Sequence, residues 1–155
     1  MTNITEEDES WMRHALNLAK QAELSGEVPV GAVLVRDGKI IGKGHNCPIS
    51  KNDPSAHAEI VALQDAAKRI GNYRIENASL YVTLEPCPMC VGALLQARIK
   101  KLIFAARDTK SGAVGGVINL LADNLWTHKI DYSSGILSAE CGEILREFFR
   151  ARRNK

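Results

Sequence analysis

The alternation of hydrophobic and polar positions predicts helices and strands in turn along the chain. Apolar residues three or four apart indicate a helix with one buried face, and short apolar runs bounded by turn residues indicate a buried strand. The expected helices span about residues 5–26, 55–70, 88–97 and 117–122, and a last one begins near residue 137. The expected strands span about residues 28–35, 39–46, 78–83 and 101–106, with a weaker one at 129–132.

Turn residues and glycines refine this pattern. Asp37 and Gly38 separate the first two strands and favour a tight hairpin. Gly42 and Gly44 lie within the return strand, which indicates that another backbone approaches it closely. After a polar loop, residues 53–55 are expected to supply the cap and first-turn proline of the next helix. The residues expected on the buried face of that helix are Ile60, Leu63, Ala67 and Ile70.

An opening hairpin followed by alternating strands and helices predicts the α/β class. The expected architecture is a three-layer α/β/α sandwich with a central five-stranded mixed sheet covered by helices on both faces. A length of 155 residues suits one well-buried core, so we expect residues 1–155 to form a single domain.

Composition and charge limit the classes of function. Hydrophobic residues make up 45% of the chain and charged residues 25%, which is typical of a globular protein. The formal net charge is only +2, so any affinity for nucleic acid must come from a local basic patch. No apolar run approaches the ~20 residues of a membrane span, and the acidic N-terminal segment lacks the apolar core of a signal peptide. We therefore expect no membrane partner and a cytoplasmic location.

The most informative motif combines Cys87 and Cys90 with an upstream His57-Ala58-Glu59. Four cysteines without a secretion signal favour reduced thiols and metal binding over disulfides. Two thiols and one imidazole are the three protein ligands that a catalytic zinc keeps while its fourth position stays open for water. A carboxylate beside the ligands can take a proton from that water and pass it on, and we assign this role to Glu59. His-x-Glu followed by Pro-Cys-x-x-Cys is the pattern of zinc nucleobase deaminases.

Other readings of the cysteines were weighed against this one. A redox Cys-x-x-Cys normally follows the first strand, whereas Cys87 follows the third expected strand. Cys47 could be a fourth ligand, but a catalytic site needs that position for water, so we favour a bystander thiol. Cys141 falls on the apolar face of the last helix and is expected in the core.

The C-terminal segment carries aromatic and cationic residues together. Phe148 and Phe149 are interleaved with arginines, and such faces suit unstacked bases and phosphates. These arginines are Arg146, Arg150, Arg152 and Arg153. Asn46 stands at the loop that enters the predicted site, where contact with a substrate is expected.

The chain resembles the bacterial tRNA-specific adenosine deaminases of the cytidine-deaminase-like superfamily. The resemblance covers nearly the whole chain, including residues 53–59 and 80–87, and it includes the loop 106–113 and the Phe-Phe-Arg segment 148–150. It implies a cytidine-deaminase-like fold and hydrolysis of adenosine to inosine at the wobble position, with release of ammonia. It also implies one Zn2+ per chain, a tRNA anticodon stem-loop as partner, and a homodimer whose sites are completed across the interface.

Roles for particular residues follow from this resemblance and its chemistry. His57, Cys87 and Cys90 are expected to hold zinc, and Glu59 is expected to move protons. Asn46 and the backbone around Ala58 are expected to bind the purine edge. The full set of expected substrate contacts is Asn46, Ala58, Pro29, Val30, Pro86, Asp108, Lys110, Phe149, Arg150, Arg152 and Arg153.

Two alternative functions remain open at this stage. Pro-Cys-Pro-Met-Cys also occurs in guanine deaminases of the same superfamily, and activity on free guanine without tRNA would favour that reading. A non-enzymatic, zinc-stabilised RNA-binding module would share the C-terminal segment but would not need Glu59.

Overall fold

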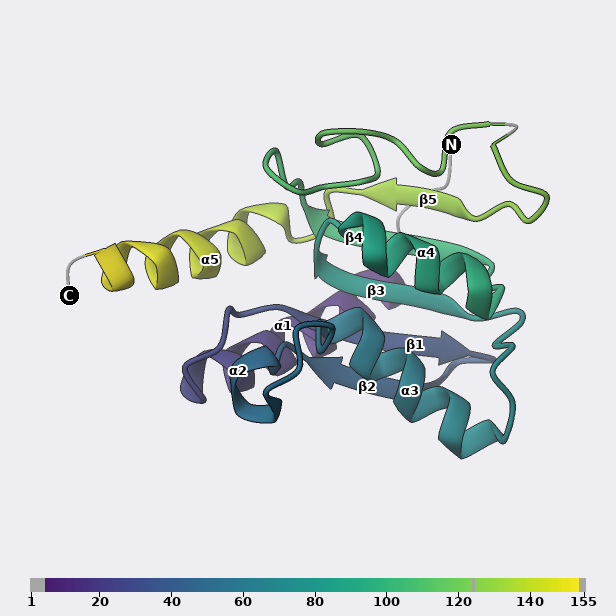
Figure 1. The fold of residues 1–155 in the computed structure, drawn as a ribbon, viewed down its shortest axis with the longest axis horizontal. Helices are drawn as coiled ribbons and strands as arrows, with labels where there is room; N and C mark the ends of the chain where they lie inside the picture. The colour runs from purple at the N-terminus through teal and green to yellow at the C-terminus, as the bar shows by residue number, and fades with distance from the viewer. Residues whose placement is uncertain (1–4, 124, 154–155) are drawn as a thin grey trace.

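The computed structural model describes residues 5–123 and 125–153 and places one five-stranded sheet between helices (Figure 1). The helices are α1 Glu6–Leu24, α2 Pro48–Lys51, α3 Ala58–Ile70, α4 Pro88–Ala97 and α5 Ser138–Arg153. The strands are β1 Gly31–Arg36, β2 Lys39–His45, β3 Ser79–Leu84, β4 Lys101–Ala106 and β5 Asp131–Ser134. None of the helices in these ranges is long and apolar enough to cross a membrane.

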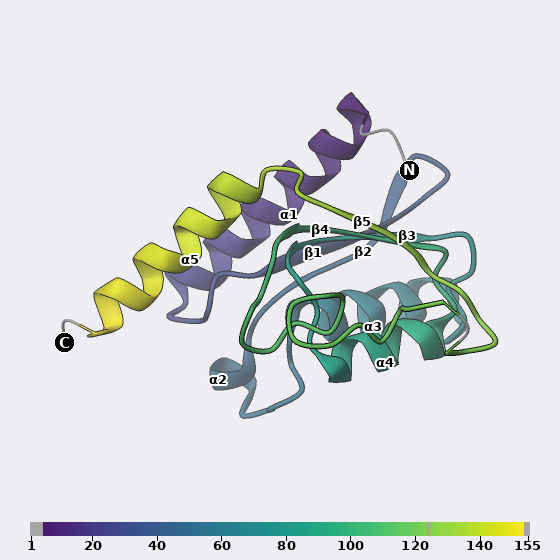
Figure 2. The ribbon, with the colours of Figure 1, turned by 90° about the horizontal axis from the view of Figure 1, so that it is seen from above.

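The sheet is mixed, with the strand order β2-β1-β3-β4-β5. β1 pairs antiparallel with β2 and β3, whereas β3, β4 and β5 run parallel. Figure 2 shows α1 and α5 on one face and α3 and α4 on the other. Successive side chains alternate between these layers, since Val33 and Ile103 join the cluster of α1 and α5 while Leu34 and Phe104 join that of α3 and α4. The predicted three-layer sandwich with a mixed sheet is confirmed.

The opening hairpin forms as predicted and sets the position of α3. Asp37 and Gly38 both have positive φ, 53° and 71°, as a tight hairpin turn requires. A Cβ on Gly42 would lie 2.6 Å from the carbonyl oxygen of Ala62, and one on Gly44 would lie 2.7 Å from its nitrogen. The backbone of α3 therefore lies directly on β2, which confirms the close approach and fixes where the helix begins.

The first helix is tied to the sheet by its N-terminal turn. Thr5 and Asp8 form the capping box, each side chain accepting from the other's backbone N–H. The hydroxyl of Tyr81 on β3 donates to the Asp8 carboxylate at 2.5 Å. This bond joins the start of α1 to the central strand of the sheet.

Some expectations for the third helix are wrong. α3 begins at Ala58 rather than near Ser55, and Asp53 does not cap it, because its carboxylate accepts from the N–H and hydroxyl of Ser55 instead. Among the residues expected on its buried face, only Leu63 is fully buried. The residues that are buried are Ala58, Glu59, Ala62, Leu63 and Ala66. Small side chains face the sheet here because the helix backbone lies so close to β2.

Further differences lie in the loops. Residues 117–122 are not helical, because an isolated bridge joins Val114 to Asn119 and the Asn119 side chain accepts from the backbone of Leu121. The first strand begins at Gly31 rather than residue 28, and β5 lies two residues later than expected. The short helix α2 within the polar loop was not predicted.

Candidate functional site

Two helix N-termini bring the predicted metal ligands together. His57 immediately precedes α3, Cys87 immediately precedes α4, and Cys90 lies in the first turn of α4. The Nδ1 of His57 lies 3.6 Å from the Sγ of Cys87 and 3.5 Å from that of Cys90. The three ligand atoms all lie within 4.8 Å of one another, so the group can hold a metal ion.

The spacing of these atoms fits tetrahedral zinc. Zinc–sulfur bonds of about 2.3 Å and zinc–nitrogen bonds of about 2.0 Å at a tetrahedral angle separate nitrogen from sulfur by about 3.5 Å. The two observed separations, 3.6 and 3.5 Å, agree with that value. A hydrogen bond from Cys90, helped by His57, lowers the pKa of Cys87 to about 4, while the same bond and burial raise the pKa of Cys90, so without a metal ion the two thiols share one proton.

Glu59 lies in the first turn of α3, next to the metal-binding group. Its side chain is buried, with 4% of the residue exposed. Burial raises the pKa of Glu59 to about 7, against the opposing effects of its own backbone and of His57. A carboxyl group that exchanges its proton near neutral pH is suited to proton transfer.

Asn46 and Ala58, both expected to contact substrate, are bonded to each other. The Oδ1 of Asn46 accepts from the backbone N–H of Ala58 at 2.7 Å, while the Asn46 N–H donates to the carbonyl of Val30. The Ala58 N–H is therefore used within the protein. The side-chain NH₂ of Asn46 takes no part in this bond.

Three further apolar residues expected to contact substrate are buried in the protein. They are Pro29, Val30 and Pro86. The carbonyl of Pro86 accepts from Ala113, as that of Val30 does from Asn46. Pro86 thereby ties the segment between β3 and α4, which ends at Cys87, to Ala113, and Val30 fixes the backbone of Asn46.

A cavity of about 1020 Å³ opens between the loop after β4 and the outer part of α5. Leu84, the last residue of β3, lines it and stands three positions before Cys87. The cavity also contains every polar residue predicted as a substrate contact outside the metal corner, together with Phe149. Those residues are Asp108, Lys110, Phe149, Arg150, Arg152 and Arg153.

Some of the cations around this cavity are bonded to other groups of the protein, and others are not. Arg146 pairs with Glu143 at 2.8 Å, and Arg107 lies 3.9 Å from Glu85. The guanidinium of Arg152 donates to the carbonyl of Gly26 and lies 4.5 Å from the centre of the Phe148 ring. Within residues 5–123 and 125–153, the remaining cations of the cavity form no ion pair. They are Lys110, Arg150 and Arg153.

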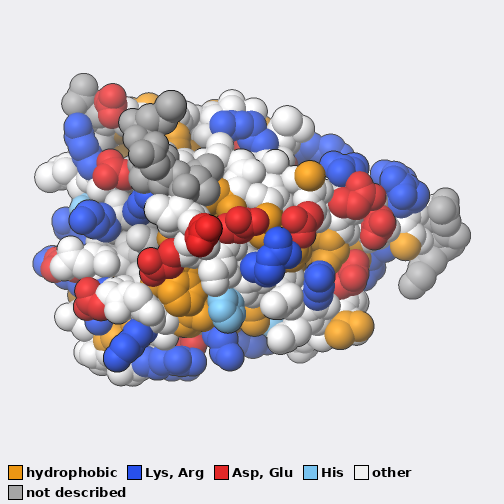
Figure 3. Space-filling view, turned by 180° about the vertical axis from the view of Figure 1, so that it is seen from behind, with side chains coloured by type: hydrophobic (Ala, Val, Ile, Leu, Met, Phe, Trp, Pro, Cys, Tyr) orange, Lys and Arg blue, Asp and Glu red, His pale blue; other side chains and the backbone are white. Residues whose placement is uncertain are grey.

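Of the two adjacent aromatic residues on α5, the one expected to contact substrate, Phe149, is the exposed one. Phe148 is buried on the inner face of α5, whereas Phe149 is 45% exposed. On the face formed by α1 and α5, acidic and basic side chains are intermixed rather than gathered into one basic patch (Figure 3). The cationic character is therefore local to the cavity.

Two buried carboxylates beside the site were missed by sequence reasoning. Glu85 accepts hydrogen bonds from the loop after β4, and Glu27 accepts from the backbone of Ile49 and Ser50 in α2. The only local signal was an acidic residue next to an apolar run, since their loop partners lie far along the chain.

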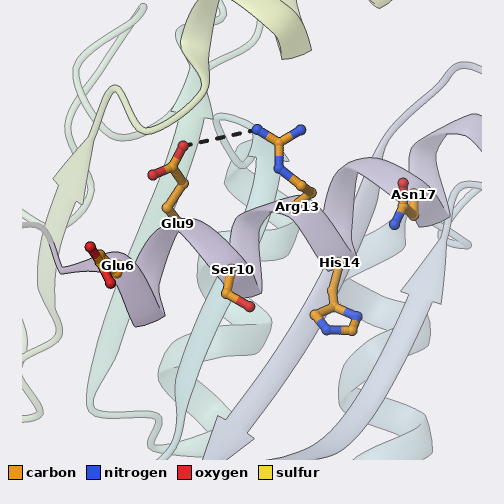
Figure 4. Close-up of a pocket in the computed structure, with 6 residues that line it drawn as sticks. All are labelled: Glu6, Glu9, Ser10, Arg13, His14 and Asn17. Atoms are coloured by element: carbon orange, nitrogen blue, oxygen red, sulfur yellow. Dashed lines mark ion pairs between the residues drawn. The ribbon is translucent and has the colours of Figure 1, made fainter.

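Among the residues that the structure describes, the remaining cysteines belong to no further metal-binding group. Cys47 is buried outside the His-Cys-Cys group, and Cys141 is buried on the inner face of α5, as expected for a core residue. A hollow of about 570 Å³ lies on α1, where Arg13 pairs with Glu9 at 3.9 Å (Figure 4) and with Glu140 at 3.2 Å. The one arginine of this hollow is thus already paired within the protein.

Known proteins resemble the chain over almost its entire length. The model of the MafB19-like deaminase family matches residues 6–153. The tRNA-specific adenosine deaminase of Haemophilus influenzae is 52% identical over 97% of this chain and 88% of its own length. That of Bacillus subtilis is 46% identical over 96% of this chain and 92% of its own length.

Solved structures show the same relationship. One from a study of A-to-I editing by tRNA:A34 deaminases has a TM-score of 0.84 and 42% identity, covering 88% of this chain and 99% of its own. The guanine deaminase of Bacillus subtilis has a TM-score of 0.62 and 31% identity, covering 98% of this chain and 96% of its own. The chain therefore belongs to the MafB19-like deaminase family and, within it, groups with the tRNA-specific adenosine deaminases.

Proposed function

We propose that the protein is a zinc-dependent hydrolase that converts adenosine to inosine at the wobble position of a tRNA anticodon and releases ammonia. One observation carries the proposal: the start of α3 brings His57 and the buried Glu59 together with Cys87 and Cys90 at the start of α4, and Leu84, three residues before Cys87, lines a cavity that also contains cations without an ion pair in the described part of the chain. The curated relatives bear the corresponding name. A tRNA substrate also places the enzyme in the cytoplasm.

The three metal ligands and Glu59 have separate roles in the proposed reaction. His57, Cys87 and Cys90 would hold the zinc ion, which would supply Lewis acidity to the attacking water. Glu59 takes one proton from the water as its oxygen bonds to C6 of the purine, and passes this proton to the ring nitrogen. Glu59 then takes the second proton from the new C6 hydroxyl and passes it to the amine, which leaves as ammonia when the C6–N bond breaks. Its burial keeps this proton exchange away from bulk solvent.

The purine is oriented by the bonded pair of Asn46 and Ala58. Because Asn46 Oδ1 is occupied by the Ala58 N–H, the Asn46 NH₂ donates to an acceptor on the base edge. The buried backbone of Val30 and Pro86 holds this wall rigid. An anticodon loop is single-stranded, so extruding its base costs less than opening a duplex.

The anticodon stem-loop occupies the cavity between the loop 107–111 and α5. Lys110, Arg150 and Arg153 contact phosphates, and exposed Phe149 offers a face for base stacking. Asp108 fixes the turn of the loop through the N–H groups of Lys110 and Ser111. Arg152 contributes while also tying α5 to Gly26.

A second copy of the chain covers the outer face of α4. Met89 and Trp126 are 39% and 50% exposed, and a hollow of about 420 Å³ lies between Leu95, Leu120 and Trp126. Exposed apolar surface of this kind is typical of protein interfaces. Sedimentation at micromolar concentration should show a dimer, and a protein that remains monomeric would contradict the proposed homodimer.

Guanine deaminase is the second candidate, supported by the likeness to the Bacillus subtilis enzyme. The tRNA:A34 deaminase structure is 42% identical to this chain, against 31% for the guanine deaminase, which favours the tRNA substrate. A non-enzymatic RNA-binding module has no use for the buried carboxyl of Glu59, whose desolvation is costly.

The direct test is conversion of adenosine to inosine in an anticodon stem-loop. Wild-type protein should form inosine at the wobble position, and Glu59→Gln should retain zinc while losing about 100-fold or more of the turnover. If Glu59→Gln turns over normally, another group moves the protons. The unreacted stem-loop serves as the blank.

A further inference from the structure

The Glu85 carboxylate holds the loop of residues 107–116 by its backbone. One oxygen accepts from the N–H of Asp108 at 3.1 Å, and the other accepts from Val114 and Gly116, each at 2.9 Å. The side chain is fully buried, with 0% of its surface exposed. A buried carboxylate is costly unless it accepts several hydrogen bonds, and here all its partners in the backbone come from this one loop.

Two glycines of the loop lie too close to Glu85 and Asp108 to carry a side chain. A Cβ on Gly112 would lie 2.2 Å from an oxygen of Glu85, and a Cβ on Gly116 would lie 2.1 Å from the carbonyl oxygen of Asp108. Neither position accommodates a side chain without moving the loop. Arg107 adds a guanidinium 3.9 Å from the same carboxylate. The two glycines therefore permit the close approach that the hydrogen bonds require.

The same loop forms one wall of the cavity that faces α5. Asp108, fixed through its N–H by Glu85, in turn accepts the N–H groups of Lys110 and Ser111 on its own Oδ1, both at 3.0 Å. All three residues line the cavity. The backbone of Lys110, from which its cationic side chain extends, is thus held through Asp108 by the Glu85 carboxylate.

Glu85 also lies in the segment between β3 and α4 that leads to the metal ligand Cys87. Glu85 is two residues before Cys87, and its own N–H donates to the carbonyl of Ala106 on β4 at 2.8 Å. The next residue, Pro86, accepts from the N–H of Ala113 at 2.9 Å. The loop 107–116 therefore bonds directly to the segment 85–86, which leads to the metal ligand Cys87.

We infer that Glu85 is a positioning residue that fixes the 107–116 loop against the Cys87 corner and so sets the affinity for a polynucleotide substrate. This inference rests on the proposed tRNA function. Glu85 touches neither the reacting base nor the metal, and it acts through Asp108 and Lys110. Its effect should appear in KM for the stem-loop and leave kcat per bound zinc nearly unchanged.

The test compares Glu85→Gln with the wild-type protein on an anticodon stem-loop containing adenosine at the wobble position. The carboxamide keeps the length of the side chain but turns an N–H donor toward loop N–H groups, which breaks at least one hydrogen bond. KM should rise about tenfold or more, with kcat per zinc changed less than about threefold. A purely structural role would instead lower the zinc content or the active fraction, and hence kcat, at unchanged KM.

Two further variants keep the test decisive. Gly116→Ala displaces the loop while leaving Glu85 intact, and it should raise KM in the same way even if Glu85→Gln does not fold. Glu27→Gln is the matched control, since it neutralises the other buried carboxylate that holds a loop, and it should not reproduce the KM effect. An equal rise in KM for Glu27→Gln would overturn the inference.

The outcomes separate this inference from the proposed function. If the wild type acts on the stem-loop but folded, zinc-loaded Glu85→Gln or Gly116→Ala retains the wild-type KM, only the role of Glu85 is overturned. If the wild type itself does not act on the stem-loop, the proposed function is wrong and the inference falls with it.

Discussion

Removing two cations from the cavity should weaken RNA binding in a way that salt makes measurable. Arg146, Arg107 and Arg152 are engaged by the fold, which leaves Lys110, Arg150 and Arg153 to neutralise phosphates. The perturbation is the double variant Arg150→Ala/Arg153→Ala. Both residues are exposed, so their loss should leave the fold and the metal site unchanged.

The expected magnitude follows from the number of phosphate contacts. Each neutralised phosphate contributes a slope of about 0.7 to 0.9 in log affinity against log salt. Three contacts therefore predict that wild-type affinity falls about 20- to 40-fold between about 50 and about 200 mM salt. One remaining contact, from Lys110, predicts a fall of only about threefold in the double variant.

The assay is equilibrium binding of a labelled stem-loop over a salt series, with zinc content measured on the same samples. Lys20→Ala/Lys68→Ala is the matched control, because it removes the same two charges from exposed positions on α1 and α3 outside the cavity. The control should keep the wild-type slope. A double variant as salt-sensitive as the wild type would refute the placement of RNA in this cavity.

Two further predictions concern the metal and the N-terminal turn. Cys87→Ser should lose most of its zinc and lower the melting temperature, because metal binding is coupled to folding; full zinc occupancy, measured by metal analysis, would count against the ligand set. Tyr81→Phe removes the 2.5 Å bond to Asp8 and should destabilise the protein by about 1 kcal/mol at neutral pH. Partial burial raises the pKa of Asp8, but hydrogen bonds from Tyr81 and Thr5 outweigh it and lower this pKa below 3.8. The stability that these bonds give is therefore present above about pH 4 and is lost as the pH falls through the pKa of Asp8 in the folded protein. The gap between Tyr81→Phe and wild type in denaturant melts should thus narrow toward pH 3, and a constant gap would show that Asp8 is not the partner.

Local sequence patterns predicted the layers and the metal corner well. His57 and Cys87 each stand immediately before a segment with a helical hydrophobic period, so the position of these ligands followed from where two helices begin. A close approach at the second strand was predicted from Gly42 and Gly44, and the structure confirms it and shows that the neighbour is α3. Periodicity was informative here because each of these features depends on neighbours in the chain.

Features that depend on distant partners were not predicted. Glu85 bonds to residues 23 to 31 positions away, and no local pattern shows that a glutamate will be buried by a loop so far along the chain. Residues 117–122 have a helical composition, but their backbone bonds are taken by the folded loop that Glu85 anchors.

The central claim is that this deaminase acts on RNA rather than on a free base. The most direct measurement compares ammonia release from an anticodon stem-loop with wobble adenosine, free adenosine, cytidine and guanine, at equal concentrations and with the same enzyme preparation. The cations and the exposed aromatic face of the cavity predict that the stem-loop reacts far faster than any of the free compounds. Faster release of ammonia from guanine than from the stem-loop would contradict the account and establish the guanine deaminase alternative.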